Sequence, residues 1–179
     1  MTPPLRTAGE STPISLIQWD SSWPKCLSRP ERDPLLAFLQ ERFGIPRTLF
    51  DRYDLYKRGT TVWLLNKDPR LRDLAALKVE SVGFLLLRWV QSRLKPTSAA
   101  LQLFGNHLNK NIVRLTPEQL RDLVERTELE GDFAASPGYV ATVTNSLVIG
   151  CALYVPGRLI SQFPRHMFTS QMWQHMKGR

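Results

Sequence analysis

Gly138–His166, GYVATVTNSLVIGCALYVPGRLISQFPRH, has the clearest strand pattern in the second half of this 179-residue chain. Gly138–Thr144 and Leu147–Val155 are rich in β-branched and aromatic residues, and two polar residues separate them. This pattern predicts a β-hairpin. Pro156-Gly157 then predicts a turn into a last strand, Arg158–Phe163. The stretch therefore predicts three consecutive strands.

The segments upstream predict short elements of both kinds. In Leu94–His107, LKPTSAALQLFGNH, Pro96-Thr97-Ser98 predicts the start of a short helix that Gly105 ends. The run Thr116-Pro117-Glu118-Gln119 has the capping-box pattern with proline at the first helical position. The second half is thus expected to be a compact, barrel-like module of short strands with two small helices.

The first half predicts a small α/β unit. Asp33-Pro34 predicts a helix start, apolar residues recur at helical spacing to Phe43, and Gly44 ends the helix. The segments 54–57 and 61–65 flank a tight turn and predict a hairpin. The β-branched and aromatic run 79–90 predicts a long strand.

These elements together predict an α+β fold class. We expect a tail over residues 1–30, a small α/β domain with an antiparallel sheet over 31–91, the pseudo-barrel module over 92–168, and a basic tail over 169–179.

The charge of the chain is positive and unevenly distributed. There are 24 Lys and Arg against 16 Asp and Glu, a net charge of +8. No acidic residue occurs between Ser81 and Pro117, or from Phe133 to the end. Those stretches hold nine basic residues, namely Arg88, Arg93, Lys95, Lys110, Arg114, Arg158, Arg165, Lys177 and Arg179. A module with one sign of charge predicts an anionic partner.

Several classes of site are not indicated. The cysteines, Cys26 and Cys151, form no CxxC pair and no Cys/His cluster, so no metal site is predicted. No G-x-G spacing, P-loop, HExxH or Ser-His-Asp pattern occurs, so we predict no cofactor and no catalytic residues. The apolar stretch Val82–Val90 is interrupted by Arg88 and is too short to span a membrane. We expect a cytoplasmic protein.

An acidic run between Glu118 and Asp132 offers an alternative interpretation as paired catalytic carboxylates. Because Glu118, Asp122 and Glu125 stand at helical spacing with arginines between them, a solvated helix face is the better interpretation. Such a helix is expected to face away from an anionic partner.

The second half resembles a PUA domain, an RNA-binding module. The runs that carry the resemblance are 95–101 (KPTSAAL), 104–105 (FG), 111–115 (NIVRL), 150–154 (GCALY) and 157–164 (GRLISQFP). They are similar to the PUA-like C-terminal extension of Sun/Fmu-type RNA cytosine-5 methyltransferases. Phe104-Gly105-Asn106-His107, after a small α/β domain, also resembles a two-domain factor of large-ribosomal-subunit biogenesis.

The resemblance implies binding of structured RNA, ribosomal or transfer RNA, in ribosome biogenesis or RNA modification, without catalysis. The cofactor-binding and catalytic parts of the methyltransferases have no counterpart in this chain. One alternative is a protein interaction module that recruits RNA to a separate methyltransferase or ribosome-assembly protein. A third hypothesis, an enzyme acting on RNA, has no motif in its favour.

The predicted RNA contacts form one group around His107 and Lys110 and a second group around Arg158 and Arg165. Lys95 lies in the connection between the two halves of the chain. For the strand Arg158–Phe163 the sequence does not decide which face is buried. Either Arg158 and Ile160 or Leu159 and Ser161 face the core, because side chains alternate along a strand. The predicted RNA-binding residues are Lys95, Asn106, His107, Lys110, Arg114, Tyr154, Arg158, Ser161, Gln162 and Arg165. Arginine suits phosphate oxygens, glutamine suits base edges, and Tyr154 is the predicted stacking group.

Overall fold

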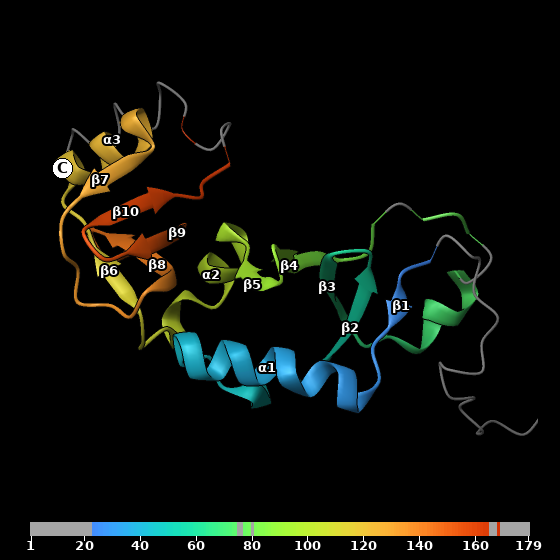
Figure 1. Cartoon of the computed structure of the whole chain (residues 1–179). Helices are drawn as coiled ribbons and strands as arrows, with labels where there is room; N and C mark the ends of the chain where they lie inside the picture. The colour runs from blue at the N-terminus through green and yellow to red at the C-terminus, as the bar shows by residue number, and fades with distance from the viewer. Residues whose placement is uncertain (1–22, 75–76, 80, 165–167, 169–179) are drawn as a thin grey trace, which may run out of the picture.

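The computed structural model describes residues 23–74, 77–79, 81–164 and 168, and it contains two five-stranded sheets (Figure 1). The elements in chain order are β1 (Lys25–Cys26), α1 (Arg29–Phe43), η2 (Arg47–Phe50), β2 (Tyr53–Arg58), β3 (Thr61–Asn66), η3 (Pro69–Leu74), β4 (Phe84–Val90), β5 (Arg93–Pro96), α2 (Ser98–Leu103), η4 (Gly105–His107), β6 (Ile112–Arg114), α3 (Pro117–Arg126), β7 (Glu128–Glu130), β8 (Gly138–Thr144), β9 (Leu147–Val155) and β10 (Arg158–Ser161). The predicted α+β class is confirmed.

The first sheet has the order β1-β2-β3-β4-β5, and every neighbouring pair is antiparallel. The predicted hairpin is β2 and β3, with Gly59 in its turn at a φ of +54°. The predicted long strand is shorter than expected and begins at Phe84. Gly83 has a φ of +57°, a conformation that interrupts an extended strand.

The second sheet has the order β6-β8-β9-β10-β7, in which β6 runs parallel to β8 and the other pairs are antiparallel. The hairpin of β8 and β9 has the predicted bounds, and its turn residues Asn145 and Ser146 both have positive φ. Two residues with positive φ are typical of the type I′ turn, whose twist matches that of paired strands.

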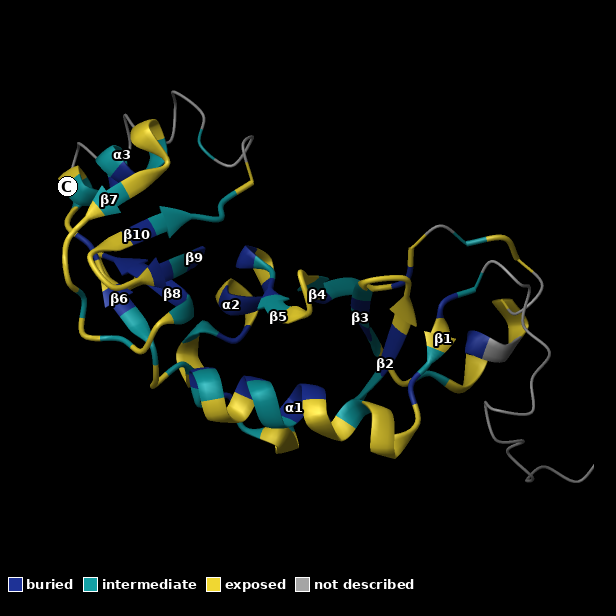
Figure 2. Ribbon diagram, in the orientation of Figure 1, coloured by how far each residue is buried: buried dark blue, intermediate teal, exposed yellow. Residues whose placement is uncertain are grey.

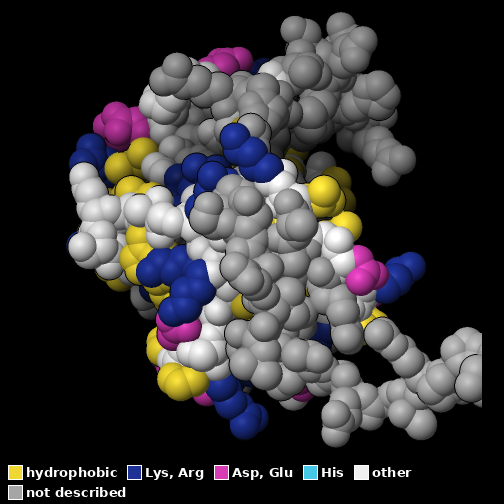
Figure 3. All heavy atoms as spheres, turned by 90° about the vertical axis from the view of Figure 1, so that its right-hand side faces the viewer, with side chains coloured by type: hydrophobic (Ala, Val, Ile, Leu, Met, Phe, Trp, Pro, Cys, Tyr) yellow, Lys and Arg dark blue, Asp and Glu magenta, His cyan; other side chains and the backbone are white. Residues whose placement is uncertain are grey.

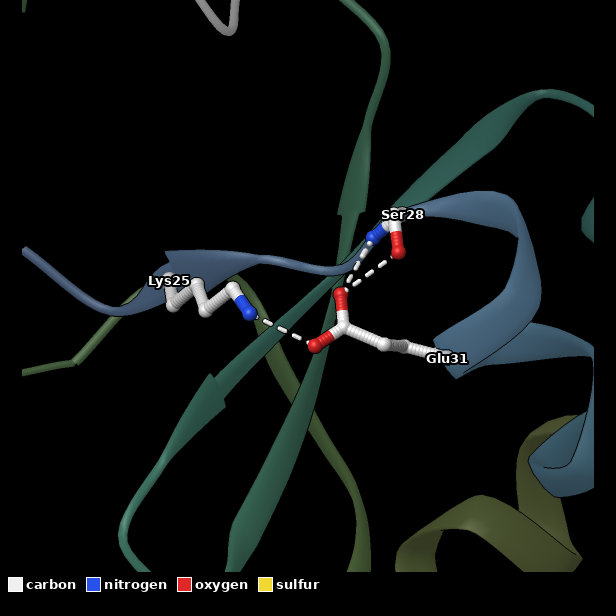
Figure 4. A network of polar contacts seen from close by, with 3 residues as sticks. All are labelled: Lys25, Ser28 and Glu31. Carbon is white, nitrogen blue, oxygen red and sulfur yellow. Dashed lines mark hydrogen bonds and ion pairs between the residues drawn. The ribbon is translucent and has the colours of Figure 1, made fainter.

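Helix α1 begins earlier than Asp33, which corrects both the predicted helix start and the end of the predicted tail at residue 30. The Glu31 carboxylate accepts hydrogen bonds from the backbone N–H of Ser28 at 2.9 Å and from its hydroxyl at 2.7 Å (Figure 4). Glu31 also pairs with Lys25, on β1, at 2.6 Å. These contacts stabilise a helix start at Arg29, because they satisfy a backbone donor that the first turn leaves without a partner.

The contacts of Glu31 predict an acid-sensitive contribution to stability. The hydrogen bond from Lys25, followed by those from Ser28, lowers the pKa of Glu31 from 4.5 to about 2. A depressed folded-state pKa stabilises the fold above the unfolded-state pKa, and this stabilisation is lost as the pH falls through the folded-state value. Glu31→Gln is therefore expected to lower the denaturation midpoint at neutral pH and to have little effect near pH 2.

The matched control is Glu41→Gln, which changes an exposed carboxylate on the same helix. This variant should behave as the unmodified protein does at both pH values. An equal loss of stability for Glu31→Gln at neutral and acid pH would contradict the assigned role of its charge.

Two hydrophobic clusters hold the molecule together (Figure 2). The larger cluster contains the apolar face of α1, buried residues of the first sheet, and also Leu101 of α2 with Ala141 and Cys151 of the second sheet. The smaller cluster packs Leu120 and Leu123 of α3 on the opposite face of the second sheet. The two halves of the chain thus share the larger cluster.

The predicted division near residue 91 falls between two paired strands. β5 pairs with β4 as the edge of the first sheet, and α2 follows it directly and packs against β9 of the second sheet. Helix α1 runs along one side of the molecule from the first sheet to the second (Figure 1). The region that joins the two sheets is therefore built from elements of both halves.

Candidate nucleic-acid interface

The C-terminal end of α1 is tied to the second sheet by Arg42. Its Nε donates to the carbonyl of Tyr139 at 2.8 Å, and its Nη2 donates to the carbonyl of Ser136 at 2.6 Å. The Arg42 carbonyl accepts a hydrogen bond from Nδ2 of Asn111 at 2.7 Å. Desolvation lowers the pKa of Arg42. These bonds fix the start of β8 and the loop before β6 against the helix end.

Gly138 is required beside this arginine. Its φ is +120°, and a Cβ at this position would lie 3.1 Å from Nη2 of Arg42. A side chain here would be strained and would also crowd the guanidinium. The glycine that begins the predicted strand therefore permits the close approach of α1.

A groove opens where α1, β5, β8 and β9 meet. It has a volume of about 570 Å³, which falls within the range of small-ligand pockets. Its lining is mostly apolar and consists of Phe38, Leu94, Pro137, Gly138, Leu153, Tyr154, Val155 and Pro156, with Arg42, Arg93 and Tyr139. The groove thus combines an apolar wall, two arginines and a half-buried tyrosine.

Lys95 and Gln162, two predicted site residues, meet beside this groove. Nζ of Lys95 donates to Oε1 of Gln162 at 2.7 Å, which links the first sheet to the segment after β10. The same Nζ lies 6.0 Å from the centroid of the Tyr139 ring. The structure therefore brings together residues that are far apart in the sequence.

Positive charge gathers on one face of the β4–β5 edge. Arg88 is paired with Lys95 in the strand register, and Arg93 lies two residues before Lys95 on the same face. Arg88 and Arg93 are exposed, and none of the three has an ion-pair partner among the described residues. Their charges are available to an anionic ligand.

The structure shows which face of the last strand, β10, is buried. Leu159 is fully buried in the smaller cluster on the α3 side. Arg158 and Ile160 therefore face the other way, and Ile160 is paired in register with Leu153 of the groove wall. Ser161 lies beside Val124 and Phe163 on the α3 side, so it does not join Gln162 and Arg158 as predicted.

Arg158 is on the groove side of the sheet, but it is partly neutralised. Nη1 of Arg158 lies 3.6 Å from the carboxylate of Glu128 on β7, and both side chains are about half exposed. An exposed ion pair of this kind is weak and leaves the arginine able to exchange partners.

Tyr154 is not placed as a stacking group, contrary to the prediction. Only 6% of its surface is exposed, and its ring makes an edge contact with Phe133 at 5.9 Å between centroids. Its hydroxyl donates to Asp132 at 3.3 Å. The ring belongs to the core of the second sheet, because strand alternation turns it away from the face that carries Tyr139.

The remaining predicted residues occupy neighbouring surfaces. Asn106 and His107 form η4 with Gly105, and all of Asn106, His107, Lys110 and Arg114 are exposed. Lys110 lies in the loop held by Asn111 at the end of α1. Arg165 lies outside the described residues.

The predicted RNA contacts do not lie on one common face of the second sheet. Arg114 lies on the edge strand β6 beside Val143, near the end of β8. Arg158 is paired with Val155, level with the start of β8. The two arginines therefore occupy opposite ends of the second sheet, and the groove is closer to Arg158.

The sequence prediction did not name Arg42, Arg93 or Tyr139 as site residues. Arg42 is indistinguishable in sequence from any basic residue in the last turn of a helix, where cations are common. Arg93 belongs to an acid-free stretch, and this was the sequence signal that could have indicated its contact with an anionic partner. Tyr139 differs from Tyr154 only through the strand face on which each lies.

The acidic residues of α3 are on the other side of the second sheet from the groove. Leu120 and Leu123 of α3 pack on the face that carries Val140 and Leu159. Asp122 pairs with Arg126 across one helical turn at 4.0 Å, as the solvated-face interpretation expects. The sheet therefore separates these carboxylates from the basic residues of the groove.

A second hollow lies in the first half, at the start of α1. It has a volume of about 610 Å³ and is lined by Leu27, Arg29, Arg32, Asp33, Leu36, Arg47, Asp51 and Lys67. Figure 3, which views the first-sheet end, shows further groups of Lys and Arg side chains on this surface. Acidic side chains are interleaved with the basic ones in this hollow, unlike the face that carries Arg93 and Lys95.

Neither cysteine is activated. Desolvation raises the pKa of the buried Cys151 to about 12, and desolvation also raises the pKa of Cys26. A raised pKa disfavours the thiolate, which is the nucleophilic form. Among the described residues there is no cluster of His, Cys, Asp and Glu suited to a metal ion. No helix in the described ranges is long and apolar enough to cross a membrane.

No family model and no curated protein matches the chain. Among solved structures, the chain is similar to a crystal structure of a PUA domain from Aeropyrum pernix K1 in a tartrate complex. The two are 18% identical, the alignment covers 86% of this chain and 90% of that chain, and the TM-score is 0.49. A likeness at this TM-score does not establish a common fold, so the PUA resemblance of this chain rests on its own motifs.

Proposed function

We propose that the protein binds structured RNA through the basic groove between its two sheets. The observation that carries this proposal is the set of Arg88, Arg93 and Lys95 on one face, without acidic partners in the described chain, beside the half-buried Tyr139. Cations without internal partners attract phosphates, and an adjacent aromatic ring favours nucleic acid over other polyanions.

The RNA is ribosomal or transfer RNA, and the protein acts in ribosome biogenesis or RNA modification without catalysing a reaction itself. This part of the proposal is supported by the PUA-like motifs of residues 95–164. Shape and phosphate contacts supply most of the affinity, and a few contacts to bases add selectivity.

Binding is expected to weaken steeply with salt. Fluorescence anisotropy with labelled ribosomal and transfer RNA fragments, over KCl from about 50 to about 400 mM, measures the dissociation constant directly. If Arg88, Arg93 and Lys95 each neutralise a phosphate of an unpaired strand, the slope of log K against log salt is about −2.

The RNA-binding proposal is wrong if no RNA fragment binds at about 50 mM KCl, or if the affinity is independent of salt. Heparin, a polyanion without bases, is the control ligand. Equal affinity for heparin and RNA would show that charge alone determines binding, and would also contradict a specific RNA site.

A further inference from the structure

Tyr139 is an aromatic side chain placed where charge and apolar surface meet. It is half buried, it lines the 570 Å³ groove, and its neighbour across the strand pair is Leu153 in the groove wall. Its backbone carbonyl accepts the hydrogen bond from Nε of Arg42. The position of the residue is therefore fixed by α1 before any ligand binds.

The cations around the ring come from the first sheet. Nζ of Lys95 is 6.0 Å from the ring centroid. Desolvation raises the pKa of the Tyr139 hydroxyl, and the positive charge of Arg93 opposes this rise. The hydroxyl stays protonated at physiological pH, so the ring is neutral and lies beside positive charges.

Other aromatic side chains of the second sheet do not share this setting. Tyr154 packs edge-on against Phe133, and Phe163 packs against Phe168 at 5.3 Å between centroids on the α3 side. These rings fill the smaller core. Among the described tyrosine and phenylalanine residues of β8, β9 and β10 and the segment after them, Tyr139 is the one whose ring packs against the larger cluster.

We propose that the groove holds one unpaired nucleotide of the bound RNA, with its base stacked on Tyr139 and its flanking phosphates on Arg93 and Lys95. This inference rests on the proposed RNA-binding function. The groove volume suits a single nucleotide rather than a duplex, and the apolar wall excludes water from the base. A site of this kind reads an unpaired position in an otherwise structured RNA.

The test uses a short RNA hairpin that carries one 2-aminopurine in its loop, because the fluorescence of this base falls when it stacks. We expect quenching on binding to the unmodified protein and to Tyr139→Phe, which keeps the ring. Tyr139→Leu is expected to bind roughly 5- to 150-fold more weakly, the range for one stacked base, without quenching. The same hairpin with its loop bases paired is expected to bind less tightly.

Tyr53→Leu is the matched control. Tyr53 is also half buried against the larger core, and Arg52 lies 4.9 Å from its ring centroid, but it is on β2 and does not line the groove. Its replacement should leave RNA affinity unchanged, and thermal denaturation of both leucine variants separates a loss of stability from a loss of stacking.

The outcomes distinguish this inference from the function on which it rests. If the unmodified protein does not bind RNA at low salt, RNA binding itself is wrong. If it binds with the expected salt dependence but Tyr139→Leu binds and quenches equally, stacking on Tyr139 is wrong and RNA binding stands. If uridine or adenosine monophosphate competes at the same concentrations as the hairpin, the occupant is a free nucleotide and the inference is overturned.

Discussion

Gly150→Ala is expected to destabilise the protein by about 3–5 kcal/mol, the sum of overpacking and a broken buried hydrogen bond. A Cβ at Gly150 would lie 2.5 Å from Oγ and 2.7 Å from Cβ of Ser98, and 3.1 Å from a ring carbon of Phe163. Ser98 begins α2, so its Cβ cannot retreat unless the helix moves. Its Oγ accepts the hydrogen bond of the buried Cys151 N–H at 3.1 Å, and displacement of α2 would break this bond.

Chemical denaturation of Gly150→Ala and three further variants tests this contact. Gly157→Ala is the control, because Gly157 has a φ of +86° but nothing within 4 Å, so only backbone strain of about 1–2 kcal/mol is expected. Ser98→Gly removes both atoms of Ser98 that are in conflict, Oγ and Cβ. The double variant Ser98→Gly/Gly150→Ala should lose less stability than the sum of the single changes. Additive losses would show that the two elements do not meet at this point.

Reversing the charge of the groove is expected to have the largest effect on RNA binding. Arg93→Glu/Lys95→Glu removes two phosphate contacts and adds two repulsive charges, so we expect roughly a 100-fold or greater loss of affinity at low salt. The salt dependence should also become shallower, because fewer phosphates are neutralised.

The matched control is Arg121→Glu/Arg126→Glu on α3. It changes the net charge of the protein by the same amount, but α3 lies on the opposite face of the second sheet. Its affinity is expected to fall far less than that of the groove variant. Equal losses would show that net charge, and not the groove, attracts RNA.

The loss of RNA affinity caused by charge must be distinguished from a loss caused by damage to the fold, because Lys95 also forms a hydrogen bond with Gln162. Arg93→Gln/Lys95→Gln removes both charges and keeps an amide at position 95 that is able to bond to the Gln162 side chain. This variant is expected to fold normally and to bind RNA with an affinity between those of the unmodified and reversed proteins. Thermal denaturation monitored by circular dichroism measures the fold.

Local elements were largely predictable from the sequence where capping and turn residues act over a few positions. The capping box at Thr116 and Gln119 and the hairpin around Asn145 and Ser146 lie where they were expected. The start of α1 was predicted wrongly, because Pro34 resembled a first helical residue. The contact between Ser28 and Glu31 outweighs this preference, and the helix tolerates Pro34 within its second turn.

The site was predictable only in part, since it depends on which strand faces meet. Lys95 and Gln162 were named from charge and motif, and the structure places them in contact across the two sheets. Tyr154 and Ser161 were named on the same grounds and lie on the opposite side of the second sheet. A shift of one residue along a strand reverses the face of a side chain, and periodicity alone does not state which face meets which neighbour.

Several features follow from the sequence alone, because they depend on residues close together in the chain. These are the α+β class, the hairpin of β8 and β9, the capping box of α3 and the excess of positive charge in two acid-free stretches. The tertiary structure was needed to show that Arg42 ties α1 to the second sheet, and that the ring of Tyr139 packs on the larger cluster whereas that of Tyr154 packs in the smaller one. Those outcomes depend on contacts between residues up to 97 positions apart, which local patterns do not specify.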